Sequence, residues 1–363
     1  MRILLVFSDV DSSPILERIV KDLKDCNLAI KVLLIGTPEM ILTSTLRQVK
    51  VSVSVIKKRS KYFLPFMVIP ITREFLYFRP SVFFASGQYA TFIGTTLAFF
   101  FQTPSRIFIR HHSNLNSRFN LRSGIWVDKI SNHAATKIVA VSNIVRRILI
   151  EDERVAIEKV VVIPNGIDTS HFLQFRQHLV KKDDIKREIF KVGVISRITQ
   201  FKGVEYTAEA FVKFNSIYPN SHLEIVGAFA DSYTEVLEIL SSLSSDAFTL
   251  SKATPSVPLF LSNLDAFVHV PIGPVEEAFG LVYLESLAIG IPTVFSLSGI
   301  LNDVVGVESF THIVPYKNSD AIFEALMEIH DESFQKKEKF PLNILAEYSL
   351  EHMSDKYLKL LKG

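Results

Sequence analysis

Two carboxylates bracket an apolar segment in the second half of the chain. The segment EEAFGLVYLESLAIGIPTVFS covers residues 276–296, and seven mostly apolar residues separate Glu277 from Glu285. Carboxylate oxygens accept hydrogen bonds from hydroxyl groups, so such a pair is suited to a ligand with a polyol at each end. A second interpretation stays open, in which Glu285 is a solvated helix residue and Glu277 an ordinary loop residue.

The residues between these carboxylates predict an anion site. Leu and Ala favour a helix over 279–289, which Gly290 and Pro292 would end. A helix start has free N–H groups and the positive end of the helix dipole. At the rise of an α-helix, Glu277 and Glu285 would lie about 12 Å apart along the axis. The hypothesis is a polyanionic ligand over the helix start, with a carboxylate for each flanking polyol.

A pair of cations precedes this segment in the chain. In SRITQFKG (196–203), Arg197 stands at the end of a predicted strand and Lys202 just before Gly203 and a predicted helix. Arginine grips phosphate oxygens in a bidentate manner and lysine adds a point charge, so the two suit a diphosphate. Surface loops often carry such cations. The interpretation therefore depends on the pairing of this motif with EAFG, about 75 residues later.

The composition indicates an ordinary globular protein of two domains. The chain has 363 residues, of which 48% are hydrophobic and 21% charged, so it is not expected to be disordered. Its single cysteine, Cys26, excludes an internal disulfide and agrees with a reducing compartment. The first residues do not resemble a secretory signal, and no apolar run reaches 18 residues. A cytoplasmic protein is expected, either free or peripheral at the inner face of the membrane.

Charge is distributed unevenly along the chain. Residues 1–150 carry 21 Lys and Arg against 8 Asp and Glu, whereas the remainder carries 19 against 30. Such a basic half indicates an anionic partner or a contact with the acidic half. The stretch IKKRSKYFLPFMVIP (56–70) mixes cations with aromatic residues and favours an anionic membrane surface, unless it is a strand or helix with a solvated basic end. No recognition motif for nucleic acid is present, so that partner is not expected.

Short β-type segments alternate with helical ones in both halves of the chain. This alternation predicts two Rossmann-like, doubly wound parallel-sheet α/β domains facing across a cleft. The expected strands are 2–8, 29–36, 81–86, 106–112, 136–142, 190–197, 222–227, 266–271 and 293–296. The expected helices besides 279–289 are 14–25, 204–218, 234–243 and 350–361.

The predicted domains are 1–164 on the acceptor side and 165–345 on the donor side, with 346–363 as a helix that packs back on the first. Ligands of such sheets bind at the carboxyl ends of the strands. Arg197, Lys202 and Glu277 all follow predicted strands, and His111 and His112 end another.

Several motifs together resemble family 4 of the glycosyltransferases, which are retaining enzymes of the GT-B fold. The motifs are IPNGID (163–168), SRITQFKG, EAFGLVYLE (277–285), RHHSN (110–114) and ATKIVAVSN (135–143), in the family's order and spacing. The first 100 residues match only as a Rossmann-like half. The resemblance implies transfer of a sugar from a nucleotide-diphospho-sugar, such as a UDP or GDP conjugate, to a saccharide or lipid-linked acceptor. Asp168 is expected to cap the turn that follows IPNGID.

The resemblance also implies roles for individual residues. Arg197 and Lys202 would neutralise the diphosphate, Glu277 would bind the sugar hydroxyls and Glu285 the ribose hydroxyls. Further contacts to the donor are implied for the backbone N–H groups of Phe279, Gly280 and Leu281, for the loop that begins at Gly227, and for His111. His112 is favoured as the histidine near the sugar, although either histidine can be an ordinary loop residue.

No cofactor and no bound metal are expected, because Arg and Lys replace a cation in this family. SDVDSS (8–13) holds the one Asp-x-Asp pair after a predicted strand. Many relatives carry a glycine-rich loop at this place, and the larger side chains here would limit a close approach of the backbone to the donor phosphate and the acceptor. The alternatives are a nucleotide-sugar epimerase of the same fold and a non-catalytic protein that binds a sugar nucleotide or a membrane.

Overall fold

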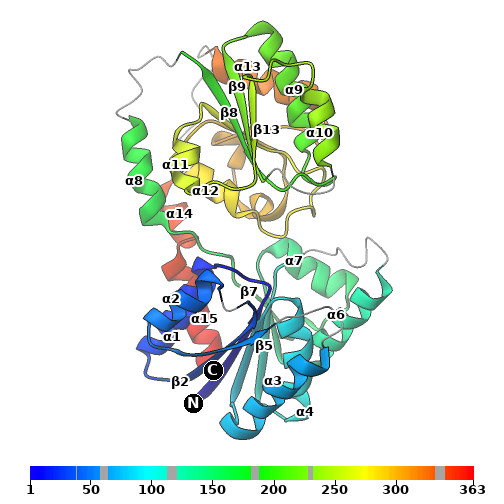
Figure 1. Ribbon diagram of the computed structural model, residues 1–363, viewed down its shortest axis with the longest axis vertical. Coiled ribbons are helices and arrows are strands. Elements are labelled where there is room, and N and C mark those ends of the chain that lie inside the picture. Colours follow the sequence, from blue (N-terminus) through cyan, green and yellow to red (C-terminus); the bar gives the residue numbers. More distant parts are fainter. Residues whose placement is uncertain (38, 58–63, 113–120, 181–187, 228–231, 332–339) are drawn as a thin grey trace. The chain divides into compact units, whose positions relative to one another are not determined.

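The computed structural model describes the chain except for residues 38, 58–63, 113–120, 181–187, 228–231 and 332–339 (Figure 1). The described residues form two compact units. Unit 1 consists of Met1–Gly166 and Leu350–Gly363, and unit 2 of Ile167–Ser349. The C-terminal segment of the chain therefore belongs to unit 1. No helix among the described residues is long and apolar enough to cross a bilayer.

Unit 1 is built on a parallel sheet of seven strands in the order β3-β2-β1-β4-β5-β6-β7. Helices cover both of its faces, which explains why its central strands are continuously apolar. In β1 the side chains from Ile3 to Phe7 are at most 1% exposed. The strands are β1 (Arg2–Ser8), β2 (Ala29–Gly36), β3 (Ser52–Lys57), β4 (Val82–Ser86), β5 (Ser105–Arg110), β6 (Lys137–Ala140) and β7 (Val160–Val162).

Two layers of helices flank this sheet (Figure 1). One layer contains α1 (Pro14–Asp25), α2 (Ile41–Gln48) and the C-terminal α15 (Leu350–Lys362). The other contains α3 (Leu64–Phe78), α4 (Thr95–Phe100) and α6 (Arg122–Ala134). The shorter helical segments are η1 (Ala90–Gly94), α7 (Asn143–Arg147), η2 (Ile148–Asp152) and η3 (Ile157–Lys159).

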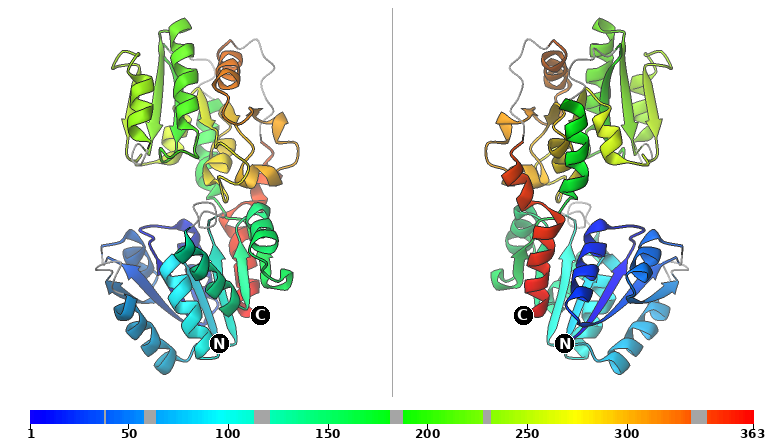
Figure 2. Two further views of the ribbon diagram at one scale, coloured as in Figure 1. Left: turned by 90° about the vertical axis from the view of Figure 1, so that its right-hand side faces the viewer. Right: turned by 90° about the vertical axis from the view of Figure 1, so that its left-hand side faces the viewer.

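Local sequence explains how α1 begins and how α15 is held. The hydroxyl of Ser13 accepts a hydrogen bond from the Leu16 N–H, 3.2 Å away, and Pro14 occupies the first turn. The ion pair between Arg18 and Glu351, at 2.5 Å, joins α1 to α15. Figure 2 shows the two helices side by side. The C-terminal helix is thus an integral part of unit 1.

Unit 2 repeats this architecture with six parallel strands in the order β10-β9-β8-β11-β12-β13. Its strands are β8 (Phe190–Ile195), β9 (Ser221–Val226), β10 (Phe248–Ser251), β11 (Ala266–His269), β12 (Thr293–Phe295) and β13 (His312–Ile313). Its helices are α8 (Thr169–Val180), α9 (Val204–Ile217), α10 (Tyr233–Leu240), α11 (Val257–Ser262), α12 (Leu281–Ile289), α13 (Ser319–His330) and α14 (Leu342–Glu347), with the short η4 (Gly299–Asp303) and η5 (Val307–Ser309). Fully buried Phe211, Phe214 and Leu326 pack α9 and α13 onto the sheet.

The two doubly wound parallel sheets confirm the predicted fold class, with corrections at some element ends. β5 ends at Arg110, so His111 and His112 lie in the following loop rather than in the strand. α12 begins two residues later than predicted, because Gly280 adopts a left-handed conformation (φ 81°) that a helix cannot contain. Of the stretch 56–70, residues 58–63 lie outside the described residues, and the remainder ends β3 and begins α3.

Candidate functional site

Three polar side chains meet at one edge of the unit 2 sheet. Lys202 lies in the loop between β8 and α9, His269 is the last residue of β11, and Glu277 lies in the loop that follows β11. The carboxyl ends of parallel strands share one edge, so these loops are neighbours. The structure therefore brings together Lys202 and Glu277, both predicted, and adds His269, which the sequence interpretation did not single out.

Glu277 is the centre of this cluster. Its Oε1 forms an ion pair with Lys202 Nζ and lies 2.9 Å from His269 Nε2. The side chains of Lys202, Glu277 and His269 are 15%, 13% and 2% exposed, so the group is largely sheltered from water while the lysine retains some access. The backbone N–H of Glu277 donates to Ser298 Oγ at 3.0 Å, which fixes the loop.

The electrostatics of the cluster favour an anionic glutamate and a neutral histidine. Burial by itself raises the pKa of Glu277, but the hydrogen bond from His269 and the charge of Lys202 outweigh it and lower this pKa to about 2. Burial also lowers the pKa of His269, and the attraction of Glu277 only partly opposes this. We assign the proton of the neutral imidazole to Nε2, which then donates to Glu277. The buried Nδ1 has no hydrogen-bond partner among the described residues.

A glycine places Lys202 against the end of β11. Gly203 has a φ of 67°, and a Cβ at this position would lie 2.0 Å from the carbonyl oxygen of Val270. Any larger residue would push the two loops apart. The N–H of Ile272 also donates to the carbonyl of Phe201 at 3.1 Å. A glycine at position 203 is therefore required for the close approach of the two loops that carry Lys202 and Glu277.

The start of α12 adds unengaged donors beside the same cluster. The backbone N–H groups of Phe279, Gly280 and Leu281 have no acceptor among the described residues. The first N–H groups of a helix lack intrahelical partners and carry the positive end of its dipole. Because these donors begin two residues after Glu277, the edge offers an ammonium group and several N–H donors to an anionic ligand.

Glu285 lies in the second turn of α12 and is isolated. It has neither a hydrogen-bond nor an ion-pair partner among the described residues, and burial raises its pKa to about 7. The simple picture of a solvated helix residue is thus not supported. The estimate of about 12 Å from Glu277 needs correction, because Glu277 lies outside the helix and the helical rise does not apply to it.

Arg197 and Gly227 occupy neighbouring strand ends. Arg197 follows β8, and its exposed side chain makes no contact with a partner among the described residues. Gly227 follows β9 and donates its N–H to the carbonyl of Ser251 at 2.8 Å. Residues 228–231, which belong to the predicted base-recognition loop, lie outside the described part of the chain. Neither Arg197 nor Gly227 contacts the Lys202 cluster directly.

The two candidate histidines belong to unit 1. His111 is exposed, and its Nε2 lies 2.8 Å from Ser86 Oγ. His112 is 34% exposed in its side chain, and its Nε2 lies 3.8 Å from Asp128 Oδ1. Both follow β5 directly, at the carboxyl edge of their own sheet.

A second buried network lies beneath these histidines and was not predicted. Arg110, the last residue of β5, is 3% exposed in its side chain. It pairs with Asp128 at 3.2 Å and with Glu153, and the other oxygen of Glu153 accepts a hydrogen bond from Asn132 at 2.7 Å. This network ties α6 and the segment after η2 to the end of β5.

The loop after β1 has structural roles. Asp11 Oδ1 accepts a hydrogen bond from the Ile41 N–H at 3.4 Å, and Ser13 caps α1. Among the residues that the structure describes, no group of three or more His, Cys, Asp or Glu is arranged to hold a metal ion. Asp168 accepts a hydrogen bond from the His171 N–H at 3.1 Å, which confirms its predicted capping role.

Two family models match consecutive parts of the chain. Residues 30–171 match the model described as Glycosyltransferase Family 4, and residues 175–343 match that of Glycosyl transferases group 1. The chain is also 26% identical to the alpha-monoglucosyldiacylglycerol synthase of Streptococcus pneumoniae over 56% of this chain and 51% of that protein. The chain spans about half the length of the curated relatives it matches.

Solved structures of the same fold cover almost the whole chain. The Anabaena protein HepE in complex with UDP and glucose has a TM-score of 0.78 and 19% identity, covering 99% of both chains. The UDP-GlcNAc 2-epimerase of Neisseria meningitidis bound to UDP-GlcNAc has a TM-score of 0.61 and 14% identity, covering 100% of both. At such identities the likeness shows the fold alone.

Proposed function

Because the chain has the GT-B fold and resembles glycosyltransferase family 4 along both of its units, we propose that it transfers a sugar from a nucleotide-diphospho-sugar to an acceptor hydroxyl. We further propose that the reaction retains the anomeric configuration and uses no metal ion. The observation that supports this most is the contact of Lys202 and His269 with Glu277, beside the unengaged N–H groups at the start of α12.

Donor binding would exchange one set of partners for another. The diphosphate accepts hydrogen bonds from Lys202 and from the N–H groups of Phe279, Gly280 and Leu281. The unengaged guanidinium of Arg197 also binds it. Glu277, relieved of the lysine but still held by His269, accepts hydrogen bonds from the sugar hydroxyls. Its low pKa keeps it an acceptor throughout the physiological range. Glu285 accepts hydrogen bonds from the ribose hydroxyls.

The transfer step builds negative charge on the diphosphate. The bond between the anomeric carbon and the phosphate oxygen breaks, and its electron pair stays on the leaving nucleotide. The acceptor oxygen bonds to the anomeric carbon from the same face, and its proton passes to the departing phosphate oxygen. Fixed donors such as Lys202 and the α12 N–H groups stabilise that charge. Glu277 stays held by His269 and accepts hydrogen bonds from the sugar hydroxyls, which argues against a nucleophilic role and for attack from the leaving-group face.

The acceptor would enter from unit 1, where His112 and His111 follow β5. We propose a saccharide or lipid-linked acceptor in polysaccharide, lipopolysaccharide or glycolipid synthesis. The support is the resemblance to a named synthase of a glucosylated diacylglycerol and the basic first half of the chain. This role implies an enzyme located at the inner face of the membrane.

A thermal-shift series tests the donor site directly. UDP, GDP, ADP and their common sugar conjugates would be added to the full chain with and without a chelator, since a ligand that binds only the folded state raises Tm. One nucleotide should raise Tm, independently of chelator, and the shift should shrink in Glu285→Ala but not in Glu238→Ala, an exposed glutamate on α10. No shift with any nucleotide would contradict the proposal and favour a non-catalytic protein.

The structural likeness to an epimerase defines the competing activity. Incubation with the matching nucleotide-sugar in the absence of any acceptor separates the two, because epimerisation needs only one substrate. Proton NMR of the recovered nucleotide-sugar should show unchanged sugar configuration. Conversion to an epimer without acceptor would overturn transfer in favour of epimerisation.

A further inference from the structure

The outer face of α3 is unusual for a helix exposed to solvent. Ile69, Leu76 and Tyr77 are 67%, 54% and 77% exposed, and Arg73 lies among them. In sequence order these four residues are four, three and one positions apart, which places all of them on one side of the helix. An ordinary surface helix places polar residues there. The outward side of α3 therefore combines apolar, aromatic and cationic groups.

The outer face of α6 repeats this combination. Trp126 and Ile130 are 65% and 40% exposed, and they alternate with exposed Arg122 and Lys129 on the same side of the helix. Lys129 Nζ lies 5.6 Å from the centroid of the Trp126 ring. α6 starts after the loop that follows β5, so this face reaches the carboxyl edge of the sheet, where an acceptor is expected.

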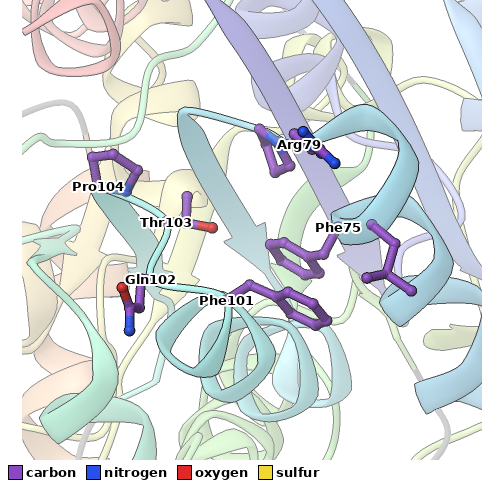
Figure 3. Close-up of a pocket in the computed structure, with 8 residues that line it drawn as sticks. Phe75, Arg79, Phe101, Gln102, Thr103 and Pro104 are labelled. Carbon is purple, nitrogen blue, oxygen red and sulfur yellow. The ribbon is translucent and has the colours of Figure 1, made fainter.

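The ends of α3 and α4 complete the surface between these helices. Phe100 is 74% exposed, and the rings of Phe75 and Phe101 stack with centroids 5.4 Å apart. Figure 3 shows the two rings in a pocket that Arg79 also lines. The pocket has a volume of about 320 Å³. A recess that combines two aromatic rings with an arginine suits part of an amphiphile with an anionic group.

The charges on this layer have one sign. Residues 51–150 hold 14 basic residues and only two acidic ones, Glu74 and Asp128. Glu74 pairs with Lys31 at 2.5 Å and Asp128 with Arg110, and their side chains are only 14% and 15% exposed. Among the described residues, α3 and α6 thus expose cations, and none of the three helices α3, α4 and α6 exposes an acidic side chain. The opposite layer differs, since α15 exposes Glu351 and Asp355.

We propose that the outer face of the α3–α4–α6 layer is the surface by which the protein docks onto an anionic lipid bilayer. This inference deepens the proposed function, because α6, which starts at the carboxyl edge of the unit 1 sheet, would bring a lipid-linked acceptor beside that edge. Lysine and arginine attract the negative surface of such a bilayer, and tryptophan and tyrosine favour its interface. An acidic soluble protein would gain little from the exposed rings of Tyr77, Phe100 and Trp126, which lie on three different helices.

Trp126 reports on this contact without any label, because it is the only tryptophan of the chain. The full chain would be mixed with vesicles of phosphatidylcholine alone or with added phosphatidylglycerol, and no nucleotide would be present. Its emission should shift to shorter wavelength with the anionic vesicles only, and the protein should sediment with them. High salt should reverse both effects. Equal binding to both kinds of vesicle, or none to either, would overturn the proposal.

Matched charge reversals locate the surface. Each basic side chain near an anionic membrane contributes about fivefold to binding, so Arg73→Glu with Lys129→Glu should weaken it more than tenfold. The control, Lys24→Glu with Lys359→Glu, reverses exposed cations on α1 and α15 and should bind as the parent chain does. Equal loss in both variants would contradict a specific face.

Two further outcomes separate this proposal from its rivals. Self-association of the free protein that Arg73→Glu with Lys129→Glu abolishes would assign the face to a second copy of the chain. A chain that binds its nucleotide yet ignores anionic vesicles would overturn the docking surface and leave the proposed donor site intact. A chain that binds vesicles but no nucleotide would do the reverse.

Discussion

Each unit has a cluster of charged side chains at the carboxyl edge of its sheet. The two clusters differ in the number of carboxylates for each hydrogen-bond donor group. In unit 1, Arg110 is 3% exposed and serves both Asp128 and Glu153. In unit 2, the single carboxylate of Glu277 is shared by Lys202, which is 15% exposed, and His269. Acceptors are in excess around the arginine, whereas donors are in excess around the glutamate.

The pKa directions of the two glutamates follow from this difference. Burial raises the pKa of Glu153, helped by the nearby Asp128 and Asp152, and Arg110 and Asn132 do not fully compensate. The pKa of Glu277 is lowered to about 2 although burial opposes it. A cation whose charge is fully paired with carboxylates stabilises the fold. A cluster with more donor groups than carboxylates can also bind an anionic ligand. The comparison therefore separates a structural cluster from a candidate binding site with similar chemistry.

Arg110→Met gives the largest expected effect, and it concerns stability. Removing the guanidinium leaves Asp128 and Glu153 buried without their cation, which typically costs about 3–5 kcal/mol of folding free energy. Chemical denaturation should show this loss in unit 1, and Arg147→Met, at an exposed position on α7, should show almost none. Adding Glu153→Gln should recover part of the loss. Similar stabilities for the Arg110 and Arg147 variants would contradict the proposed structural role of Arg110.

Lys202→Met should act on turnover instead of on folding. Glu277 keeps His269 as a partner, so the fold should survive, while loss of a donor to the developing charge should lower kcat by about 10²–10³-fold. Steady-state rates with the nucleotide-sugar identified by thermal shift would measure this. Lys191→Met is the control, because that lysine pairs with Glu224 at 2.9 Å in the same unit. Unchanged turnover in Lys202→Met would sink the proposed role.

His269→Leu should give an intermediate effect through Glu277. Hydrogen bonds to a charged group contribute about 1.5–3 kcal/mol, so kcat/KM should fall roughly 10–100-fold. The acid limb of the pH profile should also move to higher pH, because one of the two groups that lower the pKa of Glu277 is lost. His269→Gln places an amide nitrogen near the former Nε2. It should restore much of kcat/KM and return the acid limb of the pH profile towards its original position. A loss of stability with an unmoved pH profile would mean a purely packing role.

The sequence predicts the main residues of the proposed donor site better than their supporting contacts. Lys202, Glu277 and Glu285 were recognisable because charged residues interrupt apolar elements at strand and helix ends. His269 was missed because it lies in AFVHVP, a buried apolar strand in which a single histidine is not conspicuous. Its contact with Glu277 also depends on how the loop after the strand turns back, which the sequence does not show. A titratable residue at the last position of a buried strand is the signal that points to it.

Elements without a strong hydrophobic signal were missed. β13 has only two residues, and β10 is a short edge strand that is half-buried, so neither shows a clear pattern. β3 was missed as well, although SVSVIK alternates with the period of two that indicates a strand. The sequence did not predict which side of α3 faces outward. A helix with apolar residues around its whole circumference has no hydrophobic periodicity that distinguishes its buried side from its exposed side.

Glu285 provides the smallest test, through pH. Its pKa of about 7 lies above the ordinary 4.5, so the folded unit retains a proton that the unfolded chain has released. The contribution to stability is therefore complete below about pH 4.5 and is lost as the pH rises through about 7. Glu285→Gln should flatten the decline of Tm over this range, whereas Glu238→Gln should not. If the carboxylate binds ribose, nucleotide affinity should rise up to roughly tenfold between about pH 6 and about pH 8, relative to Glu285→Gln. Isothermal titration calorimetry of both chains with one nucleotide cancels the ionisation of the ligand itself. Parallel pH dependences would show that Glu285 stays protonated or lies away from the ribose, and the donor site would then end at Glu277 and the start of α12.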